Sequence, residues 1–224
     1  MAPELTLALW ERSVGRSAAE REAVLLGWAP SSLAVRNTLA LQRYAAWFGP
    51  TVEVVGRCPH CGASVEFSID TAHCAQALPD DAATQAWHPW SDGEKTLRFR
   101  LPQPSDLHAL QWVDDATEFA QRLLDRCVEG GAPESPPACE ALSQAMESLM
   151  PGASLCFGLQ CPDCTTGWEA PLDPVALLWR ELRQRAERLL GDVALLARHL
   201  GWSEAEILAL SPTRRAAYLQ LVTA

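Results

Sequence analysis

The chain has 224 residues, 48% of them hydrophobic, and a formal net charge of −10 at pH 7. This length and composition exclude a largely disordered chain and allow one domain or two small ones with a real hydrophobic core. A single lysine, Lys95, stands among 17 arginines that are scattered along the sequence. Because nucleic-acid binding depends on clustered Lys and Arg, this charge argues against nucleic acid as a direct partner.

The sequence predicts neither a signal peptide nor a membrane span. The first apolar run, Leu5 to Trp10, has no basic segment before it and stops at Glu11. No stretch approaches the ~18 apolar residues that a membrane span requires. We therefore expect an intracellular protein.

Residues 1–50 predict a segment of three helices. The second starts at a capping-box signature, in which Ser17 and Glu20 satisfy each other's backbone amides. The third runs from about Ser32 to Phe48, where a Gly-Pro pair ends it.

Two short stretches read as copies of each other: Arg57-Cys-Pro-His-Cys-Gly62 and Gln160-Cys-Pro-Asp-Cys-Thr165. In each, two residues separate two cysteines, the spacing at which one tight turn directs both sulfurs at one metal ion. The likeness extends without a gap over residues 52–70 and 155–173. Apolar residues before and after each turn predict a β-hairpin.

The two turns together supply four thiolates, the ligand set of a closed tetrahedral zinc site. The predicted ligands are Cys58, Cys61, Cys161 and Cys164. We therefore predict a split zinc ribbon over residues 51–70 and 155–173 that holds a structural Zn²⁺, because four thiolates leave no open position for catalysis. A simple ribbon has roughly 15–20 residues between its pairs. Here about a hundred residues intervene, so the metal would tie together two distant parts of the chain.

Other ligands and other uses of the cysteines stay open. His60 and His73 are competing candidate ligands, and each cysteine pair could be a redox dithiol. Four cysteines fall outside the predicted site. Cys127 and Cys156 sit in apolar patterns and are expected as small core residues, whereas Cys74 and Cys139 receive no role.

Residues 71–154 form a predicted insert with one strand, Thr96 to Leu101, and about three helices. The part from Thr71 to Gly93 is expected as a loop or short helix, in which Trp87 and Trp90 serve either as partner contacts or as buried anchors. The insert contains no glycine-rich phosphate loop, triad or clustered acid and base. Two isolated His and Asp combinations are expected to be solvated: His88 with Asp92, and Asp106 with His108. We therefore predict a non-enzymatic protein.

Residues 174–224 predict a long helix followed by two short ones. Asp173-Pro174 is a helix start, Gly191 is expected to mark a bend, and a capping box begins at Ser203. The short helices either pack on their own core or dock into a neighbouring protein. In the second case the expected contact residues are Trp202, Ile207, Arg214, Arg215 and Tyr218.

Four features resemble a known family. They are Trp10-Glu-Arg-Ser-Val-Gly-Arg16; Phe48-Gly-Pro with the first cysteine pair shortly after; Arg98-Phe-Arg-Leu-Pro102 with Asp106-Leu107; and Trp202-Ser-Glu-Ala-Glu-Ile-Leu-Ala-Leu210 with Arg214-Arg215 and Tyr218-Leu219. With them the chain resembles the zinc-ribbon baseplate proteins of contractile phage tails and phage-tail-like injection systems, which are related to the small hub proteins of large contractile phages.

The predicted elements together give an α+β, mostly helical fold in which a split zinc ribbon carries a large helical insert and helical N- and C-terminal arms. The resemblance implies a non-enzymatic part of a baseplate or its assembly in the bacterial cytoplasm, with other baseplate, hub or tube-initiation proteins as partners. Two alternatives come from other classes: a zinc-ribbon transcriptional regulator that binds nucleic acid, and a thiol redox protein. Fold-level analogy supplies most of this functional prediction.

Overall fold

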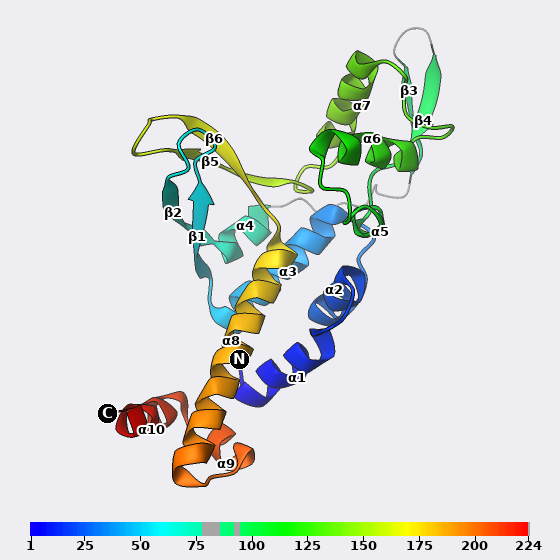
Figure 1. Ribbon diagram of the computed structural model, residues 1–224. Coiled ribbons are helices and arrows are strands. Elements are labelled where there is room, and N and C mark those ends of the chain that lie inside the picture. The colour runs from blue at the N-terminus through cyan, green and yellow to red at the C-terminus, as the bar shows by residue number, and fades with distance from the viewer. Residues whose placement is uncertain (78–85, 92–94, 224) are drawn as a thin grey trace.

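The computed structural model describes residues 1–77, 86–91 and 95–223. The molecule is elongated, with the long helix α8 (Pro174–Leu200) as its stem (Figure 1). Two β-hairpins and a separate helical lobe diverge at one end of the stem, and the C-terminal helices lie at the other. The described residues contain no helix that is long and apolar enough to cross a membrane.

The three predicted N-terminal helices are present as α1 (Pro3–Ser13), α2 (Ala18–Leu26) and α3 (Leu33–Phe48). The predicted capping box starts α2: the Ser17 hydroxyl accepts from the Glu20 N–H at 3.3 Å, and the Glu20 carboxylate accepts from the Ser17 N–H at 3.0 Å. These local signals set the helix boundaries that the packing below depends on.

The two predicted hairpins form separate two-stranded antiparallel sheets. The first pairs β1 (Thr51–Arg57) with β2 (Ser64–Asp70), and the second pairs β5 (Leu155–Gln160) with β6 (Gly167–Leu172). An aspartate then caps a helix in both copies. Asp70 accepts from the His73 N–H of α4 (Thr71–Ala77), and Asp173 accepts from the Val175 N–H of α8, each at 2.9 Å. The internal repeat therefore extends from the hairpin into the following helix.

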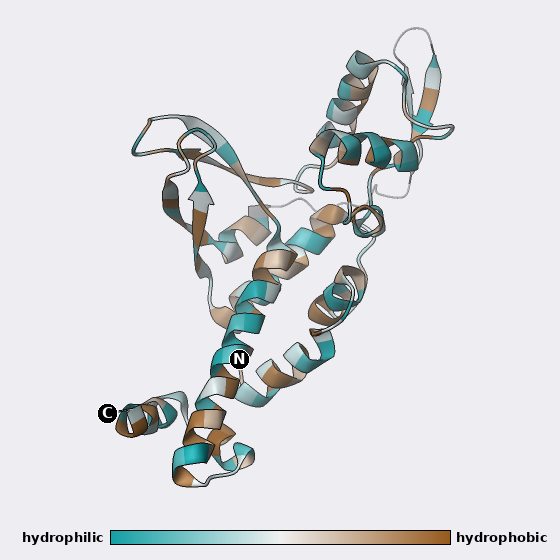
Figure 2. Ribbon diagram, in the orientation of Figure 1, coloured by the Kyte–Doolittle hydropathy of each residue, from teal (hydrophilic) through white to brown (hydrophobic). Residues whose placement is uncertain are grey.

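Helix α8 carries an apolar stripe along its whole length, at the spacing of one helix face. Its fully buried members are Leu178, Leu182, Ala186 and Leu196. The first half packs against α2, α3 and the bases of the hairpins, and the second half packs against the C-terminal helices. Hydrophobic and hydrophilic residues alternate around this helix (Figure 2). Helix α8 continues without a break through Gly191, so the expected interruption of the helix at this residue is wrong.

The C-terminal helices are α9 (Glu204–Leu208) and α10 (Pro212–Thr223). The predicted capping box at Ser203 and Glu206 is present. Both helices pack on the end of α8, in a cluster that also takes in Trp10 of α1. The two chain ends thus share one small core.

The insert forms its own lobe around a separate core that includes Phe99, Leu101 and Leu142. Its elements are β3 (His88–Ser91), β4 (Thr96–Phe99), α5 (Pro104–Ala109), α6 (Ala116–Cys127) and α7 (Pro136–Ser148). The prediction of a single strand in the insert is wrong, because β4 pairs with β3. Pro89 lies within β3, and because proline is disfavoured inside strands, the sequence pattern did not indicate a strand there. The first helix of the predicted insert, α4, instead packs on α3 in the body. The rest of the predicted loop, residues 78–85 and 92–94, lies outside the described residues.

Candidate metal centre

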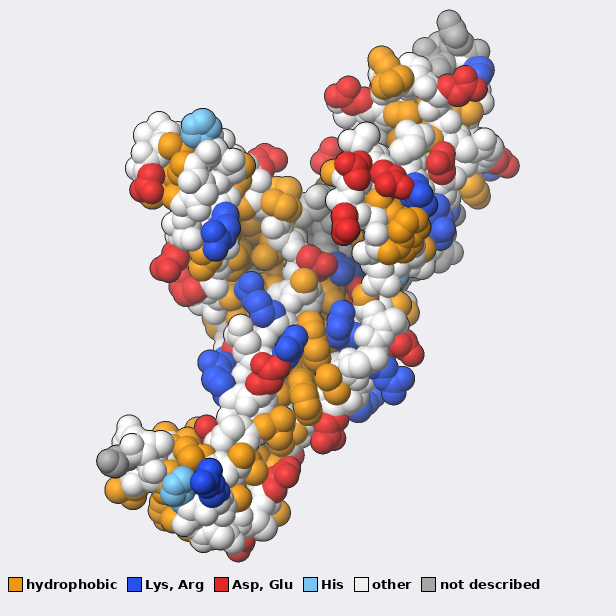
Figure 3. Space-filling view, viewed as in Figure 1, with side chains coloured by type: hydrophobic (Ala, Val, Ile, Leu, Met, Phe, Trp, Pro, Cys, Tyr) orange, Lys and Arg blue, Asp and Glu red, His pale blue; other side chains and the backbone are white. Residues whose placement is uncertain are grey.

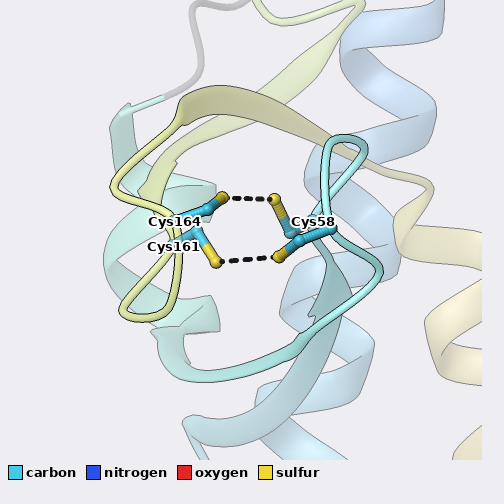
Figure 4. Close-up of side chains that lie close together, drawn as sticks. Cys58, Cys161 and Cys164 are labelled. Carbon is cyan, nitrogen blue, oxygen red and sulfur yellow. Dashed lines mark hydrogen bonds between the residues drawn. The ribbon is translucent and has the colours of Figure 1, made fainter.

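The structure brings together the four cysteines of the two predicted turns (Figure 4). Their sulfur atoms all lie within 4.8 Å of one another. The Sγ atoms of Cys58 and Cys164 are 3.6 Å apart, and those of Cys61 and Cys161 are 3.5 Å apart. Each close pair joins the two hairpins, so the cluster links segments separated by a hundred residues. Cys58 and Cys161 are buried, whereas Cys61 is exposed at the surface.

The backbone holds both turns in the same way. The N–H of the first cysteine donates to a carbonyl five residues later, from Cys58 to Ala63 at 2.9 Å and from Cys161 to Thr166 at 3.0 Å. The carbonyl of that cysteine accepts from the residue four positions on, which is Gly62 in the first turn and Thr165 in the second. Both of these residues have positive φ angles, 76° and 59°. The two turns are therefore the same structure built twice.

The four sulfurs have the spacing that a metal requires. A Zn–S bond of about 2.3 Å in a tetrahedron places the sulfurs about 3.8 Å apart, close to the two short distances. Four sulfur donors in a tetrahedron suit zinc or iron. The residues therefore fit a closed metal site with all four positions filled by protein.

Without a cation the four thiols cannot all ionise, because neighbouring thiolates repel one another. Hydrogen bonds from the Thr166 side chain and backbone lower the pKa of Cys164 to about 6. A backbone hydrogen bond at Ala63 lowers the pKa of Cys61, but its contacts with Cys161 and Cys164 outweigh this and raise it to about 12. A bound divalent cation would favour the thiolate form of all four.

Apolar side chains of the two hairpins also contact each other. The rings of Phe67 and Phe157 lie 5.8 Å apart, one from each hairpin. A Cβ atom added to Gly56 would lie 3.1 Å from Leu159 Cδ1 of the other hairpin, which is a tight contact. The close approach of the hairpins at this point therefore suits a residue without a side chain.

We predict that Thr165→Gly stabilises the protein. Thr165 is the only non-glycine residue with positive φ among those the structure describes, and this conformation costs a β-branched residue roughly 1–2 kcal/mol. Glycine relieves that cost but loses more backbone entropy on folding, so we expect a net gain of about 0.5–1 kcal/mol in thermal unfolding. The matched change at the equivalent position, Gly62→Thr, should destabilise the protein. A fall in stability for Thr165→Gly would contradict the prediction.

A polar network, which the sequence did not reveal, lies at the base of the second hairpin; Arg36 and Glu22 are buried in it, whereas the Asp173 side chain is half exposed. The Arg36 guanidinium donates to Glu22 at 2.7 Å and to both carboxylate oxygens of Asp173 at 3.0 and 3.1 Å. Glu22 also contacts His108 Nε2 of the insert at 3.1 Å. The Arg36 contacts lower the pKa of Asp173 against the opposing effect of burial. This network ties α2, α3, α5 and the start of α8 together.

The expectation that Asp106 and His108 are solvated is therefore wrong. Asp106 is 1% exposed, and its carboxylate accepts two hydrogen bonds from Arg100 and one from Arg126. His108 pairs with Glu22, as described above. Of the other predicted pair, Asp92 lies outside the described residues, and His88 stacks on Phe99 with ring centroids 5.3 Å apart.

We expect the insert to lose stability in acid through Asp106. Burial alone would raise the pKa of Asp106, but hydrogen bonds from Arg100 and the Gln103 N–H lower it below its ordinary value. A carboxyl with a lowered pKa stabilises the fold above its unfolded pKa of about 3.9 and loses that contribution as the pH falls through the folded value. Asp106→Asn should cost about 1–3 kcal/mol at pH 7 and flatten the decline below pH 4. Unfolding curves at pH 7, 5 and 3 measure this, and a variant that declines like the wild type contradicts it.

The five predicted partner-contact residues of the C-terminal segment differ in how far their side chains are buried. Ile207 is fully buried in the cluster on α8, so its side chain is closed to a partner. Trp202 and Tyr218 pack edge to face with centroids 4.8 Å apart, and Arg215 pairs with Asp192 at 3.4 Å. Arg214 is exposed. The side chains of four of the five residues thus make contacts within the chain, and the Arg214 N–H donates to the Ser211 hydroxyl at 3.3 Å.

The remaining cysteines are separate from the cluster. Cys127 is buried as predicted, and burial raises the pKa of its thiol to about 11. The prediction of Cys156 as a core residue is wrong, because alternation along β5 turns its side chain to the exposed face. Of the other two, Cys74 packs against the body, and the Cys139 thiol lies 3.0 Å from the Pro133 carbonyl oxygen. His60 and His73 are not part of the cluster.

No protein-family model, no curated protein and no solved structure matches this chain. The arguments about function below therefore depend on the chain's own residues.

Proposed function

We propose that Cys58, Cys61, Cys161 and Cys164 bind one structural Zn²⁺ and that the hairpins form a split zinc ribbon. The observation that supports this is the cluster of four sulfur atoms, all within 4.8 Å of one another. Such an ion would neutralise the thiolates and cross-link the hairpins, with no open position for a substrate. It would thereby fix the start of α8 relative to α3 and the N-terminal helices.

We further propose that the protein is a non-enzymatic structural or assembly component of the baseplate of a contractile, phage-tail-like injection system, in the cytoplasm of a bacterium. The four sequence features described above support this proposal. Two of them, around Trp10 and around Trp202 and Tyr218, pack into a single cluster on α8. An elongated molecule with separate lobes also suits a part that touches several neighbours at once, such as other baseplate, hub or tube-initiation proteins.

The experiment is to sediment contractile particles from the native host and to quantify this chain by mass spectrometry. A built-in baseplate part should co-sediment at a fixed, low copy number relative to the sheath. An assembly factor should be missing from the particles, yet deletion of its gene should stop their formation. Particles that lack the chain and still form normally after the deletion would contradict both forms of the proposal.

A thiol redox function is the second candidate, and the lowered pKa of Cys164 favours it. The two functions differ in how the exposed Cys61 reacts. Zinc-bound thiolates should resist alkylation by iodoacetamide until a chelator is added, whereas a redox dithiol should react at once. The control is Cys156, which is also exposed but lies outside the cluster and should react in both cases.

A further inference from the structure

Two neighbouring hollows, of about 500 Å³ and 330 Å³, lie along α6 and α7 in the insert. Both are lined by Ala120 and Leu124 of α6 and by Ser143 of α7. Because they share these residues, the two hollows lie next to each other, and we treat them together as one groove; Leu33 at the start of α3 also lines the smaller hollow.

The floor of the groove is apolar and adaptable. Leu123 and Leu124 line it from α6, and Met146 and Met150 line it from the other side. These are two of the three methionines in the whole chain. Methionine side chains are flexible and polarizable, and they are used at surfaces that receive apolar faces of other helices.

The groove is also strongly acidic. Glu134, Glu140 and Glu147 line it, and no lysine or arginine occurs among the described residues that do so. Residues 104–150 contain nine acidic residues and two arginines, so this fifth of the chain carries a net charge of −7 out of −10. Figure 3 shows acidic side chains gathered over this lobe.

The nearest arginine of α6 does not offset this charge within the groove. The guanidinium of Arg122 lies over the Trp112 ring, 4.5 Å from its centroid, and pairs with Glu118 at 2.6 Å. The groove therefore combines an apolar floor with an uncompensated negative rim.

We propose that this groove binds an amphipathic helix of a partner protein, with an apolar face toward the partly exposed Leu123 and Met150 and with lysine or arginine on its flanks. Charge complementarity selects this occupant, because like charges at the rim would repel an acidic helix. This inference rests on the proposed function, because it describes the chemistry of one of the partner proteins that the proposed function requires. Binding to the isolated chain can nevertheless be measured without any particle, so the failure of one proposal is distinct from the failure of the other.

The test uses the full chain and a labelled 18-residue peptide of leucine and lysine in amphipathic order, followed by fluorescence anisotropy at physiological salt. Two matched peptides serve as controls: one with glutamate in place of lysine, and one with the same composition in shuffled order. We expect saturable binding of the first peptide and at least about tenfold weaker binding of the others. Equal binding of the shuffled peptide, or no binding of the first, would overturn the proposal.

Two variants locate the binding site. Glu147 is exposed, so Glu147→Arg should leave the fold intact and weaken binding of the lysine peptide at least about fivefold. Glu11→Arg makes the same charge change on the exposed face of α1, away from the groove, and should leave binding unchanged. An equal loss in both variants would mean that net charge alone is responsible and would overturn the proposal.

The full chain and its variants also test the alternative occupant of the groove, which is a second copy of this chain. Helix α10 carries Arg214 and the 74% exposed Leu221, and it lies at the opposite end of the molecule from the groove (Figure 1). If the chain self-associates in analytical ultracentrifugation, and if Leu221→Asp and Glu147→Arg each restore the monomer, then the occupant is α10 of a second copy and the partner-helix proposal is wrong.

Discussion

Serine in place of Cys161 is expected to abolish metal binding and to unfold the two hairpins. Folding free energy in closed thiolate sites comes largely from the metal, and a site with one ligand missing loses most of it. We expect the free energy of unfolding to fall by at least about 4 kcal/mol. The midpoint of thermal unfolding should fall by about 10 °C or more for a chain of this length, with aggregation as Phe67 and Phe157 become exposed.

Cys61→Ser is the sharper form of this test. Cys161 is buried, so serine there introduces a buried hydroxyl even if no metal is bound. Cys61 is exposed, and in a metal-free protein its replacement should change stability by no more than about 0.5 kcal/mol. If the metal joins the hairpins, both variants should be destabilised alike, whereas Cys156→Ser, at an exposed position on β5 outside the cluster, should behave as the wild type. A Cys61→Ser protein that stays soluble, monomeric and as stable as the wild type would contradict the claim that a metal joins the two hairpins.

Arg36→Leu is expected to cause the second large effect. Its guanidinium donates to both the buried Glu22 carboxylate and Asp173, and only 10% of the Arg36 side chain is exposed. Removing one partner of a buried ion pair leaves an uncompensated charge and typically costs about 3–5 kcal/mol. We expect a loss of this size in chemical denaturation.

Two companion variants test the reason for that loss. Replacing Glu22 by leucine as well removes the stranded charge, so the double variant should recover at least about half of the lost stability. Arg183 forms an exposed pair with Glu187, and Arg183→Leu should change stability by less than about 1 kcal/mol. If all three proteins lost the same stability, the buried pairing would not be the cause.

Short-range signals in the sequence predicted most of the helices and both hairpins. The capping boxes at Ser17 and Ser203 and the Asp173-Pro174 pair are read within one turn of a helix, so their outcome depends little on the rest of the fold. The proximity of the four cysteines is a long-range prediction that is also confirmed, because the two turns repeat the same motif and a shared ligand set implies that they meet.

The polar network at Arg36 could not be predicted in the same way. Its partners lie 14 residues away at Glu22 and 137 residues away at Asp173, and no motif indicates that these side chains pair with Arg36. The contact of Glu22 with His108 depends on how the insert packs on the body, which no local pattern encodes. The exposure of Cys156 was missed for a related reason: its neighbours are apolar on both sides, and only the facing hairpin decides which face of β5 is buried.

The metal content and coordination of the purified protein test the central claim most directly. X-ray absorption at the zinc edge, combined with elemental analysis, should show one zinc per chain bound by four sulfur atoms at about 2.3 Å. The same measurement on Cys61→Ser should show the loss of zinc or of one sulfur ligand. A protein that folds with the same stability and contains neither zinc nor another thiolate-bound metal would contradict the account.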